Sequence, residues 1–461
     1  MILKKSLFII GLSLFTSMAY GQCDSKNGLK SLSLEEALTL MKKNNLELKI
    51  SKFTETMKAK EAQIAQGYNY GSLDLKLQAL RSNDAGNIFG FKLKSREASF
   101  GDFGFAEFDG SGQTNPLPVQ PADLNYPNAR NHFQTTLTYM LPLYTGGKLS
   151  QYSKITKALH QMSQLNSSKL LNEKVFQTTK TFYDISLLEQ YIQKLGSILE
   201  NISQLEEIVQ SMKEEGFAKE IDALEVDARK AEAQSLFTQA KYNKELAYHY
   251  LSFLLNQKIE TIKPMSQLAL APIIKKDEIQ SNNLDIQKAK LGLKITGMAV
   301  KVQESNFLPK IGAFGEYGST DDKLFNEFAD KDFYTVGVQL EWNLFNGNID
   351  KYNLEKSKVE KLKVQEQVAL AKNGICLQVK KLLTEVKSKD AEIKSLEKQF
   401  DFASKVYENY QARYKEGISS ISDVLIKQSK ELEVLLKLLT AQNDRNAKVF
   451  KLKSIINKGE A

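Results

Sequence analysis

Residues 334–347 read YTVGVQLEWNLFNG, and apolar side chains occupy every second position of the first nine. These apolar positions are Tyr334, Val336, Val338, Leu340 and Trp342. A period of two indicates a β-strand that has one apolar and one polar face. Strands of about ten such residues can cross a membrane at a tilt. Gly347 follows and predicts the turn into the next element.

Three further segments show the same alternation, most weakly the one that begins near residue 309. We therefore predict strands at about residues 72–82, 132–144, 309–319 and 332–345. Aromatic residues on membrane strands are typical of the lipid–water interface. The expected aromatic belt consists of Tyr139, Tyr144, Tyr334, Trp342 and Phe345. Ordinary packing within a sheet is the alternative explanation for these rings.

The opening stretch also belongs to an internal repeat. Its last four residues, LFNG at 344–347, correspond to LYTG at 143–146, which lies 201 residues earlier. Gly417, in the sequence KEGI, corresponds to Gly216, in the sequence EEGF, at the same separation of 201 residues. Two separate matches in one register indicate that the chain contains two copies of one unit.

A third pair of similar segments has a different separation. Asn-Asn-Leu-Glu at 44–47 resembles Asn-Asn-Leu-Asp at 282–285, which lies 238 residues later. The first copy must therefore hold 37 extra residues before residue 143. We place them in residues 83–131, a stretch rich in Gly, Asn, Asp and Pro, which we predict to be a long irregular loop.

The remainder of each copy has the pattern of long helices. Proline is absent between Pro142 and Pro264 and again after Pro309, so nothing in these stretches interrupts a helix. Apolar residues recur at spacings of mostly three and four within 185–212 and 393–414. This spacing predicts a seam along which helices pack on one another.

We therefore predict two antiparallel helical hairpins. Their helices span about residues 147–215 and 221–257 in the first copy and 348–415 and 421–457 in the second. Gly216 and Gly417 are expected at the hairpin turns, because glycine readily adopts the left-handed conformation that ends a helix. Gly146, Gly147 and Gly347 are expected at the turns from strand to helix.

The first residues have the features of an export signal. Lys4 and Lys5 precede a short apolar run, and Ala19-Tyr20-Gly21 offers a cleavage site. We divide the chain into a signal peptide (1–21), a first repeat (22–258), a linker (259–281) and a second repeat (282–461). Cys23 suggests a lipidated N-terminus, but the preceding residues are a poor lipobox, so an unlipidated cysteine is the alternative.

Composition argues against several functional classes. The net charge of +8 over 461 residues comes from interspersed Lys and Glu, which does not predict nucleic-acid binding. The three histidines, His132, His160 and His249, are scattered and lack metal-ligand spacing. No nucleophile or zinc-protease motif is present. We expect no enzyme activity, no metal and no cofactor.

The order of elements and several local motifs together resemble the TolC-like outer membrane efflux protein family. The motifs are LSLEEA at 32–37, NNLE at 44–47, LPLYTGG at 141–147 and RYKEG at 413–417 followed by Asp423-Val424-Leu425. The resemblance covers nearly the whole mature chain. It implies a mainly α fold with a membrane β-barrel part, built from two repeats of helix, strand, strand, long helix and hairpin helix. Three copies would form a 12-stranded barrel that continues into an α-helical periplasmic tunnel.

The resemblance also implies a function. Members of this family are exit ducts in the outer membrane, and an inner-membrane pump delivers drugs, ions or proteins to them through a periplasmic adaptor. The expected partners are two further copies of the chain, the adaptor, the pump and outer-membrane lipid. Four strands alone cannot close a barrel, because the smallest membrane barrels have eight. Oligomerisation is therefore expected on physical grounds as well.

In this family the hairpin turns, here at Gly216 and Gly417, form a periplasmic tip that narrows the tunnel. Asp423 matches a position that contributes a ring of carboxylates to the constriction, and Asp222 is its counterpart on the other hairpin. The best-known members carry a second acidic residue one turn later, where this chain has Ile426. We therefore expect a single acidic ring. A carboxylate that only stabilises a helix N-terminus is the alternative role for both aspartates.

Two other functions are compatible with parts of the sequence. An exported coiled-coil structural protein without a pore explains the helices but not the alternating strands. A periplasmic adaptor also has a long helical hairpin, but it has one hairpin rather than two and more strands than this sequence predicts.

Overall fold

The structure is a computed structural model that describes residues 28–107, 120–265, 268–274, 279 and 281–457. The predicted signal peptide and Cys23 lie outside the described residues. The chain divides into two compact units. We call residues 50–170 and 274–379 the sheet unit, and the described parts of 1–49, 171–273 and 380–461 the helical unit.

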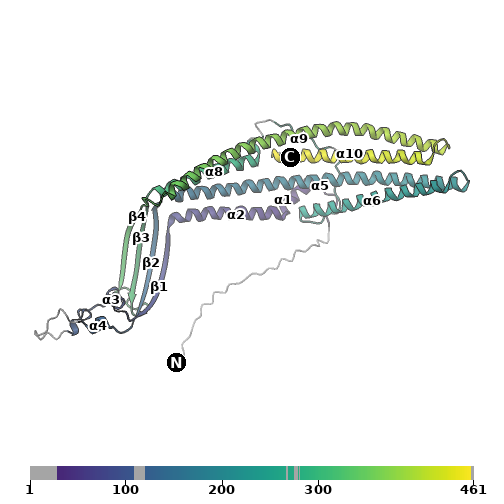
Figure 1. The fold of residues 1–461 in the computed structure, drawn as a ribbon. Coiled ribbons are helices and arrows are strands. Elements are labelled where there is room, and N and C mark those ends of the chain that lie inside the picture. The colour runs from purple at the N-terminus through teal and green to yellow at the C-terminus, as the bar shows by residue number, and fades with distance from the viewer. Residues whose placement is uncertain (1–27, 108–119, 266–267, 275–278, 280, 458–461) are drawn as a thin grey trace, which may run out of the picture. The chain divides into compact units, whose positions relative to one another are not determined.

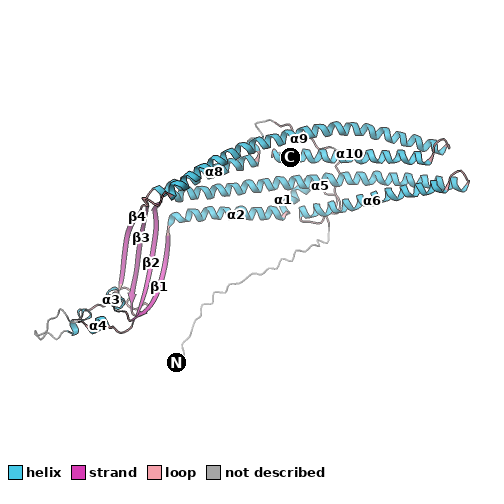
Figure 2. Cartoon of the chain, viewed as in Figure 1, coloured by secondary structure: helices cyan, strands magenta, loops and turns pink. Residues whose placement is uncertain are grey.

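Helices account for most of the described chain, and a single antiparallel sheet accompanies them (Figure 2). This composition confirms the predicted fold class. Every helix that the structure describes is too polar or too short to span a membrane.

The sheet is a four-stranded meander in which neighbouring strands follow each other along the chain (Figure 1). Its strands are β1 (Ser72–Ser82), β2 (Arg130–Tyr144), β3 (Lys310–Asp321) and β4 (Asp332–Glu341). We expected the last strand to run to residue 345, but β4 ends at Glu341. Trp342 and Phe345 therefore lie in the connection to the following helix.

Two helices lead into the sheet, one in each repeat. Helix α2 (Leu46–Gly67) precedes β1 after a short 3₁₀ turn, and α8 (Leu284–Glu304) precedes β3 in the same way. The long helices α5 (Lys148–Glu214) and α9 (Ile349–Lys415) follow β2 and β4 and contain 67 residues each. At about 1.5 Å per residue, each is roughly 100 Å long.

The stretch between β1 and β2 contains more regular structure than the expected irregular loop. Its described part holds α3 (Ala85–Lys94), the short helix α4 (Ala122–Asn125), and 3₁₀ turns at Phe100–Phe103 and Phe105–Glu107. The side chain of Asp84 accepts a hydrogen bond from Asn87 N at 2.9 Å and so caps α3. Helix α3 also buries Ile88 and Phe91, which explains why it forms among loop-like residues.

The helical unit contains α1 (Leu34–Asn44), α6 (Glu220–Leu255), α10 (Ile421–Ile455) and the later parts of α5 and α9. Residues of the predicted seam on α5 form the core of this unit; Leu195, Ile202, Leu205 and Val209 are fully buried in a cluster with residues of α6, α9 and α10. Burying one such side chain contributes about 1.5–3 kcal/mol, so the seam holds the hairpins together.

Candidate functional site

The strand register separates the side chains of the sheet into an apolar face and a polar face. One row across all four strands consists of Leu75, Leu137, Tyr317 and Tyr334, and the next consists of Leu73, Tyr139, Gly315 and Val336. The rows between them are more polar, as in Asp74, Thr138, Glu316 and Thr335, although one of these rows contains Met140 and Phe314. Four segments from distant parts of the chain are thus aligned so that their apolar residues share one face.

The apolar face is open to its surroundings within the single chain. Val336 and Leu75 are each 73% exposed, and Leu73 and Tyr334 are exposed as well. A contiguous apolar surface of this kind marks a contact with lipid or with another protein. From Leu340 to Tyr334 the apolar residues of β4 extend for about 20 Å at ~3.4 Å per residue, which is close to the height of a membrane barrel's apolar band.

The two outer strands of the sheet, β1 and β4, each pair with one neighbour only. Their other edges leave backbone N–H and C=O groups without a strand partner within the described chain. In lipid, each unpaired backbone group costs several kcal/mol. An apolar face with two open edges is therefore stable in a membrane only if other strands complete the sheet.

Two helices of the sheet unit carry exposed apolar stripes. On α2, Ile50, Phe53, Met57 and Ile64 are all exposed and, at 100° per residue, lie within a sector of about 60°. On α9, the exposed residues Tyr352, Val359, Leu362, Leu370 and Leu377 lie within a sector of about 80°. Such stripes are typical of helices that pack against a partner.

The glycines at the ends of the sheet have the conformation that their turns require. Gly146, Gly147 and Gly347 have φ angles of 61°, 84° and 70°, and Asn348 follows at 65°. The left-handed region is accessible to glycine at little cost. Of the predicted aromatic belt, Tyr139 lies within β2 and Tyr334 within β4, Tyr144 ends β2, and all five rings are exposed.

In the helical unit, the hairpin turns centre on the two predicted glycines. Gly216 has a φ of 80° and Gly417 a φ of 73°. In the second turn, Ile418 N donates to Arg413 O at 2.8 Å and Gly417 N donates to Tyr414 O at 2.9 Å. This pair of bonds is the Schellman arrangement that ends a helix at a left-handed glycine.

Asp222 and Asp423 occupy equivalent positions at the starts of α6 and α10. Asp222 Oδ2 accepts from Lys219 N at 2.7 Å. Asp423 Oδ2 accepts from Ser420 Oγ at 2.7 Å, while Asp423 N donates to the same hydroxyl at 3.1 Å. Both carboxylates therefore take part in helix capping. Asp423 is also exposed, so its charge is available to an adjacent solution.

The two hairpins contact each other near these aspartates. Ser422 Oγ donates to Glu225 Oε2 at 2.6 Å, which links α10 to α6. Burial, together with the charge of Asp222, raises the pKa of Tyr414 on α9. Asp222 therefore lies close to the end of the other hairpin. Ile426, which follows Asp423, is exposed and contributes no charge.

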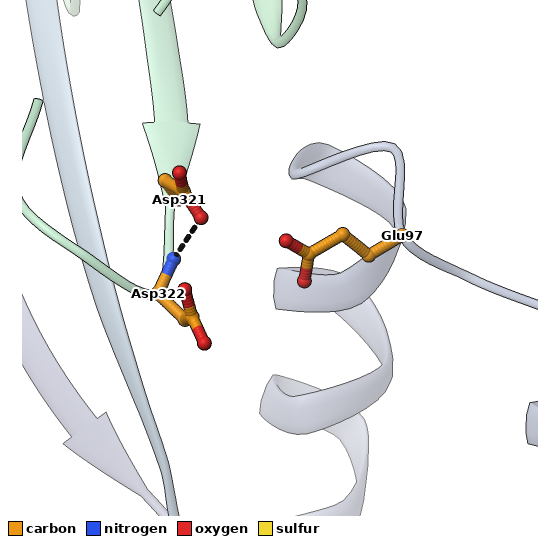
Figure 3. Close-up of side chains that lie close together, drawn as sticks. All are labelled: Glu97, Asp321 and Asp322. Carbon is orange, nitrogen blue, oxygen red and sulfur yellow. Dashed lines mark hydrogen bonds between the residues drawn. The ribbon is translucent and has the colours of Figure 1, made fainter. Parts of the chain in front are cut away.

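Sequence analysis missed a cluster of charged residues at the end of the sheet where β1 and β3 end and β2 and β4 begin. The carboxylate oxygens of Glu97, Asp321 and Asp322 lie within 4.8 Å of one another (Figure 3). Lys331 Nζ is 2.9 Å from Asp321 Oδ1 and also forms an ion pair with Glu97. Arg130 forms a further ion pair with Glu97.

Lys331 and Arg130 form ion pairs with Asp321 and Glu97, so an ion-pair network accounts for two of the three carboxylates without a metal ion. Lys331 also approaches Glu327 Oε2 at 3.1 Å. Burial alone lowers the pKa of Lys331, but its bonds to Asp321, Glu97 and Glu327 outweigh burial and raise the pKa above its ordinary value. Lys331 is therefore charged at any physiological pH.

Comparison with known proteins places these features in context. Residues 276–458 match the family described as Outer membrane efflux protein. No curated protein sequence matches the chain. Solved structures resemble it over nearly its whole length.

A CusC structure has a TM-score of 0.76 and 14% identity, with 95% of both chains covered. The CmeC outer membrane channel of Campylobacter jejuni has a TM-score of 0.77 and 16% identity over 92% of this chain and 86% of its own. The outer membrane protein VceC of Vibrio cholerae has a TM-score of 0.73 and 15% identity over 92% and 95%. At these identities the likeness establishes the fold.

Proposed function

We propose that this chain, whose residues 276–458 match the family described as Outer membrane efflux protein, forms the trimeric exit duct of an efflux or secretion system. The domain match and the shared fold confirm the family resemblance that the sequence motifs indicated. The duct crosses the outer membrane and extends into the periplasm. There it receives drugs, ions or proteins from an inner-membrane pump through a periplasmic adaptor. The family consists of channels, and we propose no catalytic role.

The observation that carries this proposal is the four-stranded sheet with one exposed apolar face and two open edges. If β4 of one copy pairs with β1 of the next, β1 and β4 each gain a second neighbour, and every strand is then paired on both edges. Three copies then supply twelve strands, which suffice to close a membrane barrel. The apolar face contacts lipid, and the polar face lines an aqueous lumen.

The exposed stripes on α2 and α9 support the same assembly. A soluble, monomeric coiled-coil protein would leave both stripes and the apolar face in water. A head-to-tail ring brings a different surface of each copy against its neighbour. We propose that the α2 stripe of one copy packs near the α9 stripe of the next, so that strands and helices close the ring together.

At the hairpin tips, Asp423 is the residue that we assign to the constriction, with Asp222 as its counterpart. A three-fold ring of exposed carboxylates attracts cations and repels anions. The capping bonds to Ser420 do not conflict with this role, because the Asp423 side chain remains exposed while it accepts the hydroxyl of Ser420.

Single-channel recording of the purified protein in planar bilayers tests the proposal. We expect discrete conductance steps with a preference for cations, and Asp423→Asn is expected to weaken that preference. Asp444→Asn removes an acidic residue from the same helix, far from its start, and serves as the control. A protein that remains a water-soluble monomer and inserts no channels would contradict the proposal.

A further inference from the structure

The segment between β1 and β2 folds back onto the polar face of the sheet. Phe91 of α3 stacks on the imidazole of His132, with ring centroids 4.0 Å apart and planes inclined by 6°. Alternate residues of a strand point to the same face. His132 lies four and six residues before Thr136 and Thr138 on β2 and is therefore on the polar face with them. Helix α3 is also in contact with β3.

Burial near this end of the sheet agrees with this packing. On the polar face, His132 and Thr320 are each 1% exposed, and Thr136 is buried as well. On the opposite face, Ser319 and Asp321 are also buried, whereas Leu137 and Tyr317, nearer the middle of the strands, are exposed. The end of the sheet is therefore covered on both faces, and the Phe91–His132 contact places α3 on the polar one.

Charged residues hold the folded-back segment in place. Glu97, three residues after α3, forms ion pairs with Lys331, which directly precedes β4, and with Arg130, the first residue of β2. Arg96 donates to Asp330 O at 3.2 Å and to Asp332 O at 2.5 Å. We call Glu97, Lys331 and Arg130 the clasp.

We propose that residues 85–107 form an outer constriction of the duct, which α3 creates and the clasp maintains. This inference rests on the proposed function, because the polar face is the lumen only in a closed barrel. It places a restriction at the outer mouth, in addition to the constriction that we assign to the hairpin tips.

The dimensions indicate that the restriction is substantial. Twelve strands about 4.8 Å apart and tilted by roughly 40° enclose a cylinder about 24 Å across, measured between backbones. A helix with its side chains is about 10 Å thick. Three copies bring three such helices into one mouth, where they fill about half of the cross-section or more.

The clasp also provides a means of opening the outer constriction. Lys331 sits among Glu97, Asp321 and Glu327, and the first two carboxylates lie within 4.8 Å of each other. Without the positive charge of Lys331, these carboxylates repel one another. Asp321 and Glu327 belong to the β3 and β3–β4 segments, whereas Glu97 belongs to the loop, so this repulsion leaves only the ion pair between Glu97 and Arg130 in the clasp and weakens the loop's attachment to the sheet.

Size-selective labelling on intact cells tests the constriction. The background carries Cys23→Ser and Cys376→Ser, so that an introduced cysteine is unique. Gln339→Cys places a thiol at an exposed position of the polar face. A small charged maleimide and a polyethylene-glycol maleimide are applied from outside, first to this parent and then to the parent with Lys331→Gln.

We expect the small reagent to label both proteins and the polymer reagent to label the parent at least tenfold more slowly than the Lys331→Gln variant. Lys94→Gln removes a charge from α3 outside the clasp and should leave the polymer rate unchanged. Lys323→Cys, in the exposed β3–β4 turn, should react with the polymer in every background and so shows that the polymer reaches the outer loops.

Equal labelling of the parent by both reagents would overturn the constriction while leaving the duct intact. Failure of the small reagent to reach Gln339→Cys, even with Lys331→Gln, would instead refute the duct itself. If Lys331→Gln does not assemble, Glu97→Gln replaces it, because it removes the loop's anchor and keeps the Lys331–Asp321 pair. Polymer exclusion that persists in Glu97→Gln would mean that the clasp does not maintain the constriction.

Discussion

Replacing Val336 with lysine is the substitution that most clearly separates a membrane sheet from a soluble one. Val336 is the fifth of the ten residues of β4, lies on the apolar face and is 73% exposed. The distance to either end of the strand is about 14–17 Å along the backbone, so the residue lies near the middle of the proposed membrane span. On a soluble protein, an exposed Val→Lys change typically alters stability by no more than about 0.5 kcal/mol.

In a membrane barrel the expected effect is much larger. A lysine on the lipid face near the bilayer midplane costs about 2–4 kcal/mol. Three copies per trimer give a total of about 6–12 kcal/mol, and 6 kcal/mol corresponds to roughly a 10⁴-fold change in an equilibrium constant. We therefore expect Val336→Lys to abolish assembly of the trimer in the outer membrane.

Thr335→Lys is the matched control, because Thr335 is the preceding residue, is exposed and lies on the polar face. The assay is the yield of folded trimer in purified outer membranes, measured by gel electrophoresis without heating and by chemical crosslinking. Thr335→Lys should assemble at near parental yield. Equal yields of the two variants, whether high or low, would refute the assignment of the faces.

Four further changes address the helical unit. Gly417→Ala forces an alanine into a φ of 73° and should destabilise the hairpin by about 1–2 kcal/mol, seen as faster proteolysis at the turn. Asp423→Asn should weaken cation selectivity without reducing trimer yield, because the variant side chain can still accept from Ser420. Tyr407→Phe removes a buried hydroxyl that has no hydrogen-bond partner in the described chain and should raise the thermal midpoint by the equivalent of about 1 kcal/mol. Burial raises the pKa of Glu431. A hydrogen bond with Ser404 lowers this pKa and the negative charge of Glu408 raises it further, and the net effect is an increase. The folded state therefore binds a proton at Glu431 more tightly than the unfolded state does. The stability that Glu431 contributes is therefore lost as the pH rises from its ordinary pKa of 4.5 through the higher pKa of the folded state. We expect Glu431→Gln to be more stable than the parent at pH 8, and we expect this difference to be smaller at pH 5.

The sequence was informative wherever structure follows from local periodicity. The alternation around Val336 predicted β4, and the three-and-four spacing between Ile185 and Met212 matches a part of α5 that is largely buried. Gly216 and Gly417 identified the hairpin turns because the left-handed conformation is a property of a single residue. Such features need no knowledge of distant contacts.

The clasp and α3 could not be predicted in this way. Glu97 and Lys331 are separated by 234 residues, and neither belongs to a periodic pattern. Residues 85–94 contain two glycines and an asparagine, so their composition indicates a loop. They form a helix because Asp84 caps it and because Phe91 packs on His132 of β2. This contact depends on how the whole sheet is assembled.

The end of β4 is a second feature that the sequence pattern alone does not predict. Alternation continues through Trp342, yet the strand ends at Glu341 because the chain must turn into α9 at Asn346-Gly347. Hydrogen bonding to β3 stops at Lys310, which is the partner of Glu341. The pairing partner, rather than the side-chain pattern, determines where the strand ends.

The pairing of β4 with β1 of another copy is the central claim, and intersubunit disulfide formation tests it most directly. Within one chain β1 and β4 are three strand spacings apart, about 14 Å, whereas a disulfide needs Cα atoms within about 7 Å. Lys76→Cys, on β1, is therefore combined with Thr335→Cys, Gly337→Cys or Gln339→Cys in a background without native cysteines, and the protein is oxidised in outer membranes. We predict that at least one pair gives covalent trimers, while the single-cysteine variants give none. Monomers in every combination, with the protein present in the membrane, would contradict the closed twelve-stranded barrel.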